Sequence, residues 1–405
     1  MVSVMLLGRA NLARAIDMQI LARNRLTVSD NIERATVGQE IEGYLLTMEG
    51  GFNLSGDMGN ATVDMLVGGG METLKSDEFS DADNYRFRLN IRVPWATTGF
   101  VEGSAGYSEE TEDPELTDIN QGRLRTRRSN VGIAAGRRSS QTFQWQANVN
   151  ARTERRIDRD LEETLGDLGW DIALDRRHSL TFDVGYRHGT EAVEGDSWTG
   201  PFLILNLTRQ SDRLTSTGFR IDWEGLQLKM DDGTRDVSDM VSITAHYAVE
   251  MPLGWSFTSD LGLDGIKPVV DERRWEPRVE ILLERLADRR VQFDGSLSIL
   301  SSIQDPAEDQ ISWTRDSQVQ TGLRWNLTSN YVVEPRVQYR YAELFGNGIA
   351  DRKDKTLLFE VGTRWSPSRI WSLDVDVVSE TIESSESAND LAENRLDLTL
   401  SGTFF

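Results

Sequence analysis

The chain has 405 residues, a formal net charge of −22, and 38% hydrophobic and 27% charged residues. This acidity argues against nucleic acid as a partner, because no basic excess exists to neutralise phosphates. No window approaches the roughly 20 apolar residues of a membrane-spanning helix, so a helical membrane protein is not expected. A transmembrane β-barrel fits these numbers, because only every second residue of its strands meets lipid.

The first residues, MVSVMLLGRANLARAIDMQ, contain an apolar run from Val2 to Leu7 that ends before Arg9. No basic residues precede this run, as they do in an export signal. Two interpretations stay open: a remnant of a signal peptide and a disordered tail. We expect an N-terminal segment over residues 1–20. One continuous domain should follow over 21–405, since no linker or shift in composition divides it.

Apolar and polar residues alternate along most of the chain after residue 20. In YRFRLNIRVPW, residues 85–95, Tyr85, Phe87 and Leu89 alternate with Arg86 and Arg88. The same period of two recurs in residues 143–152, 275–284, 291–299 and 371–378. This period indicates amphipathic β-strands, and helical periodicity is nearly absent. The sequence therefore predicts an all-β fold.

The connections between these strands alternate in length. Short ones include residues 96–98, 252–254 and 328–330, and longer acidic ones include 73–83, 108–121 and 303–310. Short turns at one rim and long loops at the other are typical of outer-membrane barrels. We predict a single transmembrane antiparallel up-and-down β-barrel of roughly 18–20 strands, with short periplasmic turns and longer acidic extracellular loops. Residues 108–121 are the best candidate for a loop that constricts the lumen.

The tryptophans support this fold over a soluble β-sandwich or propeller. One group lies beside short connections and the other beside long ones, as aromatic girdles at two membrane interfaces require. The first group comprises Trp95, Trp255, Trp325, Trp365 and Trp371, and the second Trp198, Trp275 and Trp313. A propeller would also show a repeat of about 40–50 residues, and none is found.

The strand faces opposite the apolar ones carry charge. A barrel of about 18–20 strands is too wide for side chains to fill, so these charges need water. We take the following residues as candidates to line the lumen: Arg86, Arg88, Arg92, Arg187, Arg220, Asp222, Arg278, Glu280, Arg336 and Arg340. Two roles stay open for them. They form cross-strand ion pairs that stiffen the wall, or Arg86, Arg88 and Arg92 form a surface that attracts anionic solutes.

Catalysis finds little support in this chain. Ser242 and His246 share a strand face but lie four residues apart, about 13 Å along the strand, which is too far for proton transfer. No zinc spacing, haem motif or glycine-rich phosphate loop is present. We expect a protein that is not an enzyme and that has no cofactor and no bound metal.

The last strand ends in the alternating sequence NRLDLTLSGTFF. Its apolar phase places Leu396, Leu398, Leu400 and Phe404 on one face, and Phe405 adds one more aromatic. A terminal strand of this kind resembles the signal that the outer-membrane assembly machinery reads. We therefore expect location in the bacterial outer membrane. The expected partners are its lipid and lipopolysaccharide and the assembly machinery.

Residues 25–70 resemble the start of a family of porin-2-like outer-membrane proteins, which includes members associated with exosortase (PEP-CTERM) and exopolysaccharide systems. The family opens on a strand with an L-T-x-[ST]-D-N core, here Leu26 to Asn31. Its usual Pro-Gly in the second strand is Gly50-Gly51 here, a departure. The resemblance implies a role in the export of exopolysaccharide or surface proteins, with an exopolysaccharide or a periplasmic export protein as partner.

Our sequence-based interpretation is an outer-membrane pore or export conduit. Two alternatives stay open beside it. One is a general diffusion porin for small polar solutes. The other is a structural barrel that sheathes a periplasmic partner such as an electron carrier.

Overall fold

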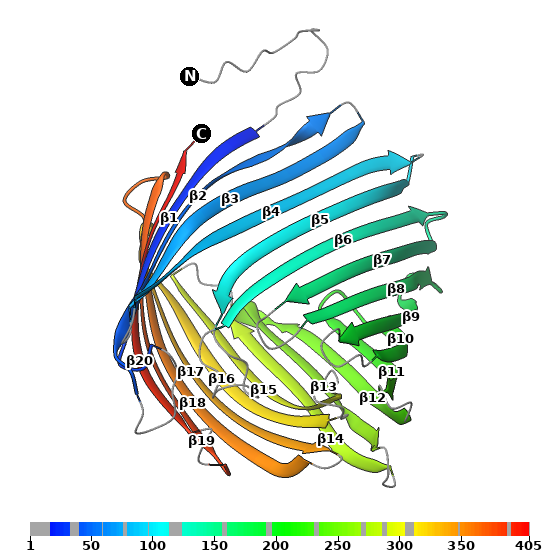
Figure 1. Ribbon diagram of the computed structural model, residues 1–405. Coiled ribbons are helices and arrows are strands. Elements are labelled where there is room, and N and C mark those ends of the chain that lie inside the picture. Colours follow the sequence, from blue (N-terminus) through cyan, green and yellow to red (C-terminus); the bar gives the residue numbers. More distant parts are fainter. Residues whose placement is uncertain are drawn as a thin grey trace.

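The computed structural model (Figure 1) forms one antiparallel sheet of twenty strands. It describes residues 17–32, 40–58, 60–75, 79–95, 97–112, 124–155, 160–191, 197–230, 235–268, 273–285, 290–303, 312–346, 349–386 and 390–404. The strands are β1 (Asp17–Ser29), β2 (Gly43–Met58), β3 (Ala61–Lys75), β4 (Phe79–Trp95), β5 (Gly99–Glu112), β6 (Leu124–Arg138), β7 (Phe143–Arg155), β8 (Asp160–Ala173), β9 (His178–Glu191), β10 (Ser197–Gln210), β11 (Thr215–Lys229), β12 (Arg235–Met251), β13 (Trp255–Lys267), β14 (Arg274–Arg285), β15 (Val291–Ile303), β16 (Ser312–Thr328), β17 (Tyr331–Gly346), β18 (Ile349–Trp365), β19 (Trp371–Ser384) and β20 (Leu391–Phe404). Among the described residues, no helix has the length and apolarity to cross a membrane.

Each strand pairs with the next, and β20 pairs with β1, so the sheet closes on itself. The closing ladder runs from Ile20, opposite Phe404, to Ser29, opposite Arg395. This confirms the predicted all-β up-and-down barrel. Strands about 4.8 Å apart and tilted by about 40° give a wall about 40 Å across between backbones. The first strand begins at Asp17, inside the segment that was expected to precede the barrel.

The wall has two chemically distinct faces. Residues that lie opposite each other on neighbouring strands point to the same face of the sheet. The pairing register therefore assigns every strand residue to one of two faces. We call the face that holds Arg86 the polar face and the other the apolar face. Large side chains of the apolar face are exposed to the surroundings, among them Trp95, Val131, Ile133, Val149, Trp275, Trp325, Phe359, Trp365 and Leu400. In a closed barrel this face meets lipid, and the polar face lies inside.

Two tryptophans depart from the predicted girdle beside the long connections. Trp275 is exposed on the apolar face, as expected. Trp198 lies on the polar face opposite Leu228 and is buried. Trp313 holds an apolar-face position but is also buried, at the outer end of β16, where it lies between Ile303 of β15 and Phe345 of β17. Neither of these two can anchor the barrel in a membrane interface.

The turns that follow the even-numbered strands β2 to β18, together with the described start of β1 and end of β20, lie on one rim. Two of these turns are built on aspartates. The Asp175 carboxylate accepts the backbone N–H groups of Arg177 and His178, and that of Asp212 accepts those of Leu214 and Thr215. At the other rim, the longest intervals between strands follow Ser29 and Glu112. The connection predicted at 73–83 is shorter than expected, because β3 and β4 extend through most of it and leave only 76–78 between them. Of the loop predicted to constrict the lumen, residues 108–112 belong to β5, and 113–121 fall outside the described residues.

Candidate functional site

The three arginines of β4 lie on the polar face, each beside a carboxylate of a neighbouring strand. Arg86 is 3.1 Å from Glu110, Arg88 is 3.9 Å from Asp64, and Arg92 is 3.8 Å from Glu102. The arginine side chains are about half exposed, at 48%, 57% and 55%. They therefore form loose, wetted ion pairs and are not a bare row of positive charge.

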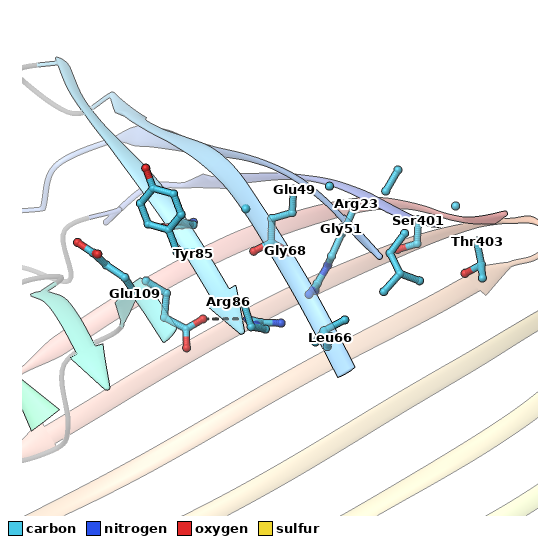
Figure 2. Close-up of a pocket in the computed structure, with 17 residues that line it drawn as sticks. Arg23, Glu49, Gly51, Leu66, Gly68, Tyr85, Arg86, Glu109, Ser401 and Thr403 are labelled. Atoms are coloured by element: carbon cyan, nitrogen blue, oxygen red, sulfur yellow. Dashed lines mark hydrogen bonds and ion pairs between the residues drawn. The ribbon is translucent and has the colours of Figure 1, made fainter. Parts of the chain in front are cut away.

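Arg86 also borders a cavity of about 220 Å³ that is lined by β1 to β5 and by the end of β20. Figure 2 shows Arg23, Glu49 and Arg86 around it. Gly51 and Gly68 supply no side chains here, and the backbones approach closely. A Cβ on Gly51 would come within 2.6 Å of the Val67 carbonyl oxygen. Gly51, part of the Gly50-Gly51 pair that departs from the Pro-Gly of the resembled family, thus shapes the wall beside the arginines together with Gly68.

The other lumen candidates also lie on the polar face and are also paired. Arg220 is 2.8 Å from Asp222, Arg278 is 2.8 Å from Glu280, and Arg336 is 3.6 Å from Glu360. Arg187 pairs with Glu224, and Arg340 pairs with Asp316. The structure thus places a carboxylate beside each of these arginines. That these residues line a solute pathway stays a prediction.

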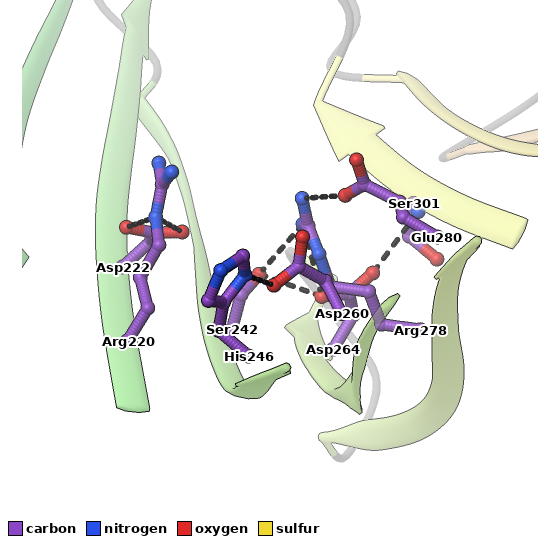
Figure 3. A network of polar contacts seen from close by, with 9 residues as sticks. All are labelled: Arg220, Asp222, Ser242, His246, Asp260, Asp264, Arg278, Glu280 and Ser301. Carbon is purple, nitrogen blue, oxygen red and sulfur yellow. Dashed lines mark hydrogen bonds and ion pairs between the residues drawn. The ribbon is translucent and has the colours of Figure 1, made fainter. Parts of the chain in front are cut away.

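A polar network crosses β12 to β15 near the long-connection rim (Figure 3). The Ser242 hydroxyl donates to Asp264 at 2.6 Å, and His246 Nδ1 lies 2.8 Å from Asp260. Arg278 adds an ion pair with Asp264 at 3.5 Å. Ser242 and His246 therefore hold separate carboxylates and do not form a nucleophile–base pair.

A second network, at the seam between β1 and β20, was missed by sequence reasoning. Asp397 is 4% exposed, and it accepts hydrogen bonds from Arg25 and Thr27. Arg395 is an additional ion-pair partner at 3.0 Å. The alternation in RLDL does place Asp397 on the polar face. Nothing in a single sequence indicates that its partner Arg25 lies 372 residues away.

The motif Leu26 to Asn31 has a structural role at this seam. The Ser29 hydroxyl donates to Glu393 at 2.8 Å, and the Asn31 side-chain amide donates to the Ala392 carbonyl at 3.1 Å. Asp30 accepts the backbone N–H of Asn394 at 2.7 Å. These polar residues close the barrel, so their pattern carries no information about cargo.

The residues of the predicted assembly signal lie mostly as expected. Leu396, Leu398, Leu400 and Phe404 hold apolar-face positions. The Phe404 ring meets Trp371 edge-on at 5.2 Å. Phe405 falls outside the described residues. Recognition of this strand by an assembly machinery stays a prediction.

No described group of three or more His, Cys, Asp or Glu side chains is placed to hold a metal ion. The charges of the polar face instead follow strands. β4 carries Arg86, Arg88 and Arg92, whereas β8 carries Glu163, Asp167 and Asp171 on the same face. Positive and negative charge are therefore concentrated on different strands of the polar face.

The barrel was compared with known proteins. No protein-family model and no curated protein matches the chain. The FrpB iron transporter of Neisseria meningitidis, F5-1 variant, matches at a TM-score of 0.63 and 11% identity, over 97% of this chain and 82% of that one. The ferric citrate transporter FecA matches at 0.57 and 11%, over 96% and 79%. The copper transporter OprC matches at 0.58 and 9%, over 96% and 80%.

This chain is a bacterial outer-membrane β-barrel. The similar structures are named transporters and receptors, not enzymes, which agrees with the predicted lack of an enzymatic role. The resemblance to the porin-2-like, exosortase-associated family is wrong. The barrel resembles metal and siderophore transporters instead, and the motif that suggested the family serves closure of the wall. At 8–11% identity these neighbours establish the shared fold alone.

Proposed function

We propose that this barrel takes up a small polar solute across the outer membrane through a water-filled lumen. One observation carries the proposal: the closed wall is apolar outside and bears half-exposed ion pairs inside. Such charges need water beside them. A lumen about 40 Å across between backbones leaves room for water and solute. Export of polysaccharide is not proposed, because its only support was the resemblance to the porin-2-like family, which is wrong.

We further propose that the solute is anionic, such as a metal chelate. The similar structures are named for iron, ferric citrate and copper, which favours a metal-containing cargo. The described residues include no group of metal ligands, so a bare cation has no evident site. The loosely paired arginines of β4 can exchange a carboxylate of the wall for one of the solute.

The test is single-channel recording in a planar bilayer under a KCl gradient. The wild type should conduct, and its zero-current potential should move toward cation selectivity when Arg86, Arg88 and Arg92 are all changed to Gln. Arg127→Gln is the matched control, because Arg127 lies on the apolar face at the rim and is 61% exposed. It should leave the potential unchanged.

Each result decides between functions. An unchanged potential in the triple variant would remove the arginines of β4 from the pathway. Conduction without any preference among anions would favour a general diffusion porin. No current from folded, inserted protein would sink the transport proposal and favour a barrel that sheathes a periplasmic partner.

A further inference from the structure

The ladder between β14 and β15 is the shortest in the described wall. It covers seven residue pairs and ends at Val279 and Ile299. Beyond that point β14 continues along β13 to Arg274, and β15 continues along β16 to Ile303. Pro277 lies in the part of β14 that has left β15, and it has no N–H to donate. The sheet therefore splits between β14 and β15 on the side of the long connections.

The outer end of the β15–β16 hairpin, residues 300–303 and 312–316, touches the polar face of the wall. We call it the lid. The Ser301 backbone N–H donates to Asp264 on β13 at 3.0 Å (Figure 3), and Arg315 pairs with Glu276 on β14 at 3.1 Å. Ser301 and Arg315 hold apolar-face positions on their own strands, whereas Asp264 and Glu276 hold polar-face positions. The lid therefore lies across the lumen side of β13 and β14.

An apolar patch on the opposite strands receives the lid. Ile303 packs against Trp198, Leu226 and Leu228 of β10 and β11. These three side chains are at most 2% exposed, although they hold polar-face positions. Apolar side chains on a wetted wall are stabilised when another apolar surface covers them. Ile303 supplies part of that cover.

The lid donates one hydrogen bond to a buried carboxylate of the wall, and a water molecule can donate this hydrogen bond instead. Asp264 is fully buried, and it accepts the Ser242 hydroxyl and the Ser301 backbone N–H. Only the second donor belongs to the lid. When the lid leaves, lumen water reaches the carboxylate and supplies the missing hydrogen bond. Both the docked and the displaced arrangement therefore satisfy this charge, as a two-state element requires.

We propose that the lid is a gate at the outer mouth of the lumen, docked on β10 to β14 in this structure and displaced when the pathway opens. This inference rests on the transport function proposed above. Few contacts join the described part of the lid to β10–β14: one aliphatic side chain, one ion pair and one backbone hydrogen bond. On its other side the lid stays paired with β17, where residues 312–316 lie opposite 342–346 and Asp316 pairs with Arg340. Displacement is therefore a swing about β17, away from β10–β14. A small set of contacts suits an equilibrium that a solute can shift.

Cross-linking tests the gate directly, since the chain has no cysteine of its own. In Arg315→Cys with Glu276→Cys, a bifunctional methanethiosulfonate reagent should hold the lid closed and abolish most of the current, and dithiothreitol should restore it. The control is Arg336→Cys with Glu360→Cys. This ion pair, at 3.6 Å, joins adjacent strands of the same face and does not involve the lid. Its current should not respond.

A substitution that weakens the contact between the lid and β10–β11 should favour the open channel. Ile303→Ser should raise the ratio of open to closed channel on the order of tenfold, the effect of one partly buried aliphatic contact on a two-state equilibrium. Ile382→Ser is the matched control. Ile382 is buried against Leu391 at the outer ends of β19 and β20, outside the lid. It should leave the ratio unchanged.

A readout without current separates the gate from the transport proposal. Spin labels on Arg315→Cys with Glu276→Cys should give two distance populations in vesicles, and Ile303→Ser should enrich the longer one. A single short distance in both backgrounds overturns the gate, whatever the current. Full current from the cross-linked protein overturns it as well and leaves transport standing. Two distances without any current would retain the moving lid and reject transport.

Discussion

At the scale of single residues, the polar face is held by carboxylates that differ in burial. Asp397 is almost completely buried at the seam, with Arg25, Thr27 and Arg395 as partners. Asp374 is 18% exposed, and its partner Arg364 is 51% exposed, so water reaches this pair. A buried carboxylate leaves uncompensated charges when it is removed, whereas an exposed pair is screened by water. Stability should therefore depend on the first carboxylate far more than on the second.

Asp397→Asn tests this difference. We expect it to lower the free energy of unfolding by roughly 2–3 kcal/mol, because the Arg25 and Arg395 guanidinium groups lose a shared carboxylate. Asp374→Asn should cost less than about 1 kcal/mol. Urea titration of the barrel in phospholipid vesicles measures both losses. Equal losses of unfolding free energy would mean that Asp397 stabilises the β1–β20 seam no more than Asp374 stabilises the β18–β19 pair.

The candidate residues illustrate what alternation along one sequence can predict. Period two places Arg86, Arg336 and Arg340 on one face without any structure. It does not reveal that Glu110 neutralises Arg86, because the cross-strand partner depends on register, and register depends on turns and strand ends. Thr27 and Ser29 were interpreted as a family motif for the same reason. Their structural partners lie at the far end of the chain, so the sequence around them does not show what they bind.

At the scale of elements, the short turns carry their own stabilising chemistry. The backbone N–H groups of Arg177 and His178 and the His178 ring lower the pKa of the Asp175 carboxyl. The backbone N–H groups of Leu214 and Thr215 lower the pKa of Asp212 in the same way. A group with a lowered folded-state pKa stabilises the fold above its unfolded pKa, and this contribution is lost as pH falls through the folded value.

Asp212→Ala should therefore reduce thermal stability in a pH-dependent way. The difference in unfolding temperature from the wild type should be constant above about pH 5, since an unfolded aspartate titrates near pH 4. It should shrink as the pH falls further and the wild-type carboxylate is protonated. Asp212→Asn keeps an acceptor oxygen and should lose less. A difference that does not change with pH would exclude the carboxylate as the source.

Other elements show where period two fails. β8 alternates poorly in sequence, because Leu161 and Leu165 share the polar face with Glu163 and Asp167, yet it pairs with β7 and β9 along its whole length. The lid was not predicted at all. The alternation of β15 and β16 continues to Ile303 and Trp313, so nothing local indicates that these ends leave the wall. Only the shortened ladder beside Pro277 reveals it.

At the scale of the whole molecule, one continuous sheet separates lipid from water. Val337 and Gln338 stand side by side in β17, on opposite faces. Val337 lies opposite Phe359 on the apolar face, and Gln338 lies opposite Gln320 on the polar face. The two side chains lie at the same height of the wall, and they differ in that Val337 faces lipid and Gln338 faces the lumen.

Val337→Arg and Gln338→Arg make this a matched test. Arginine on the lipid face near the membrane midplane should cost about 2–4 kcal/mol of unfolding free energy. Arginine at position 338 should cost less than about 1 kcal/mol, because it enters water, which screens it from Arg336 and Arg340 on the same face. Urea titration in vesicles measures the two variants side by side. Comparable losses would mean that the polar face does not meet water.

The closing ladder also sets the order of events during assembly. Arg25 meets Asp397 only after 372 further residues have been made. Until then the growing sheet has two free edges, each with a row of unpaired N–H and C=O groups. Contacts so distant in sequence form slowly. A chain that stops before β20 keeps both edges, and it is therefore a template for pairing with other chains and a substrate for proteases.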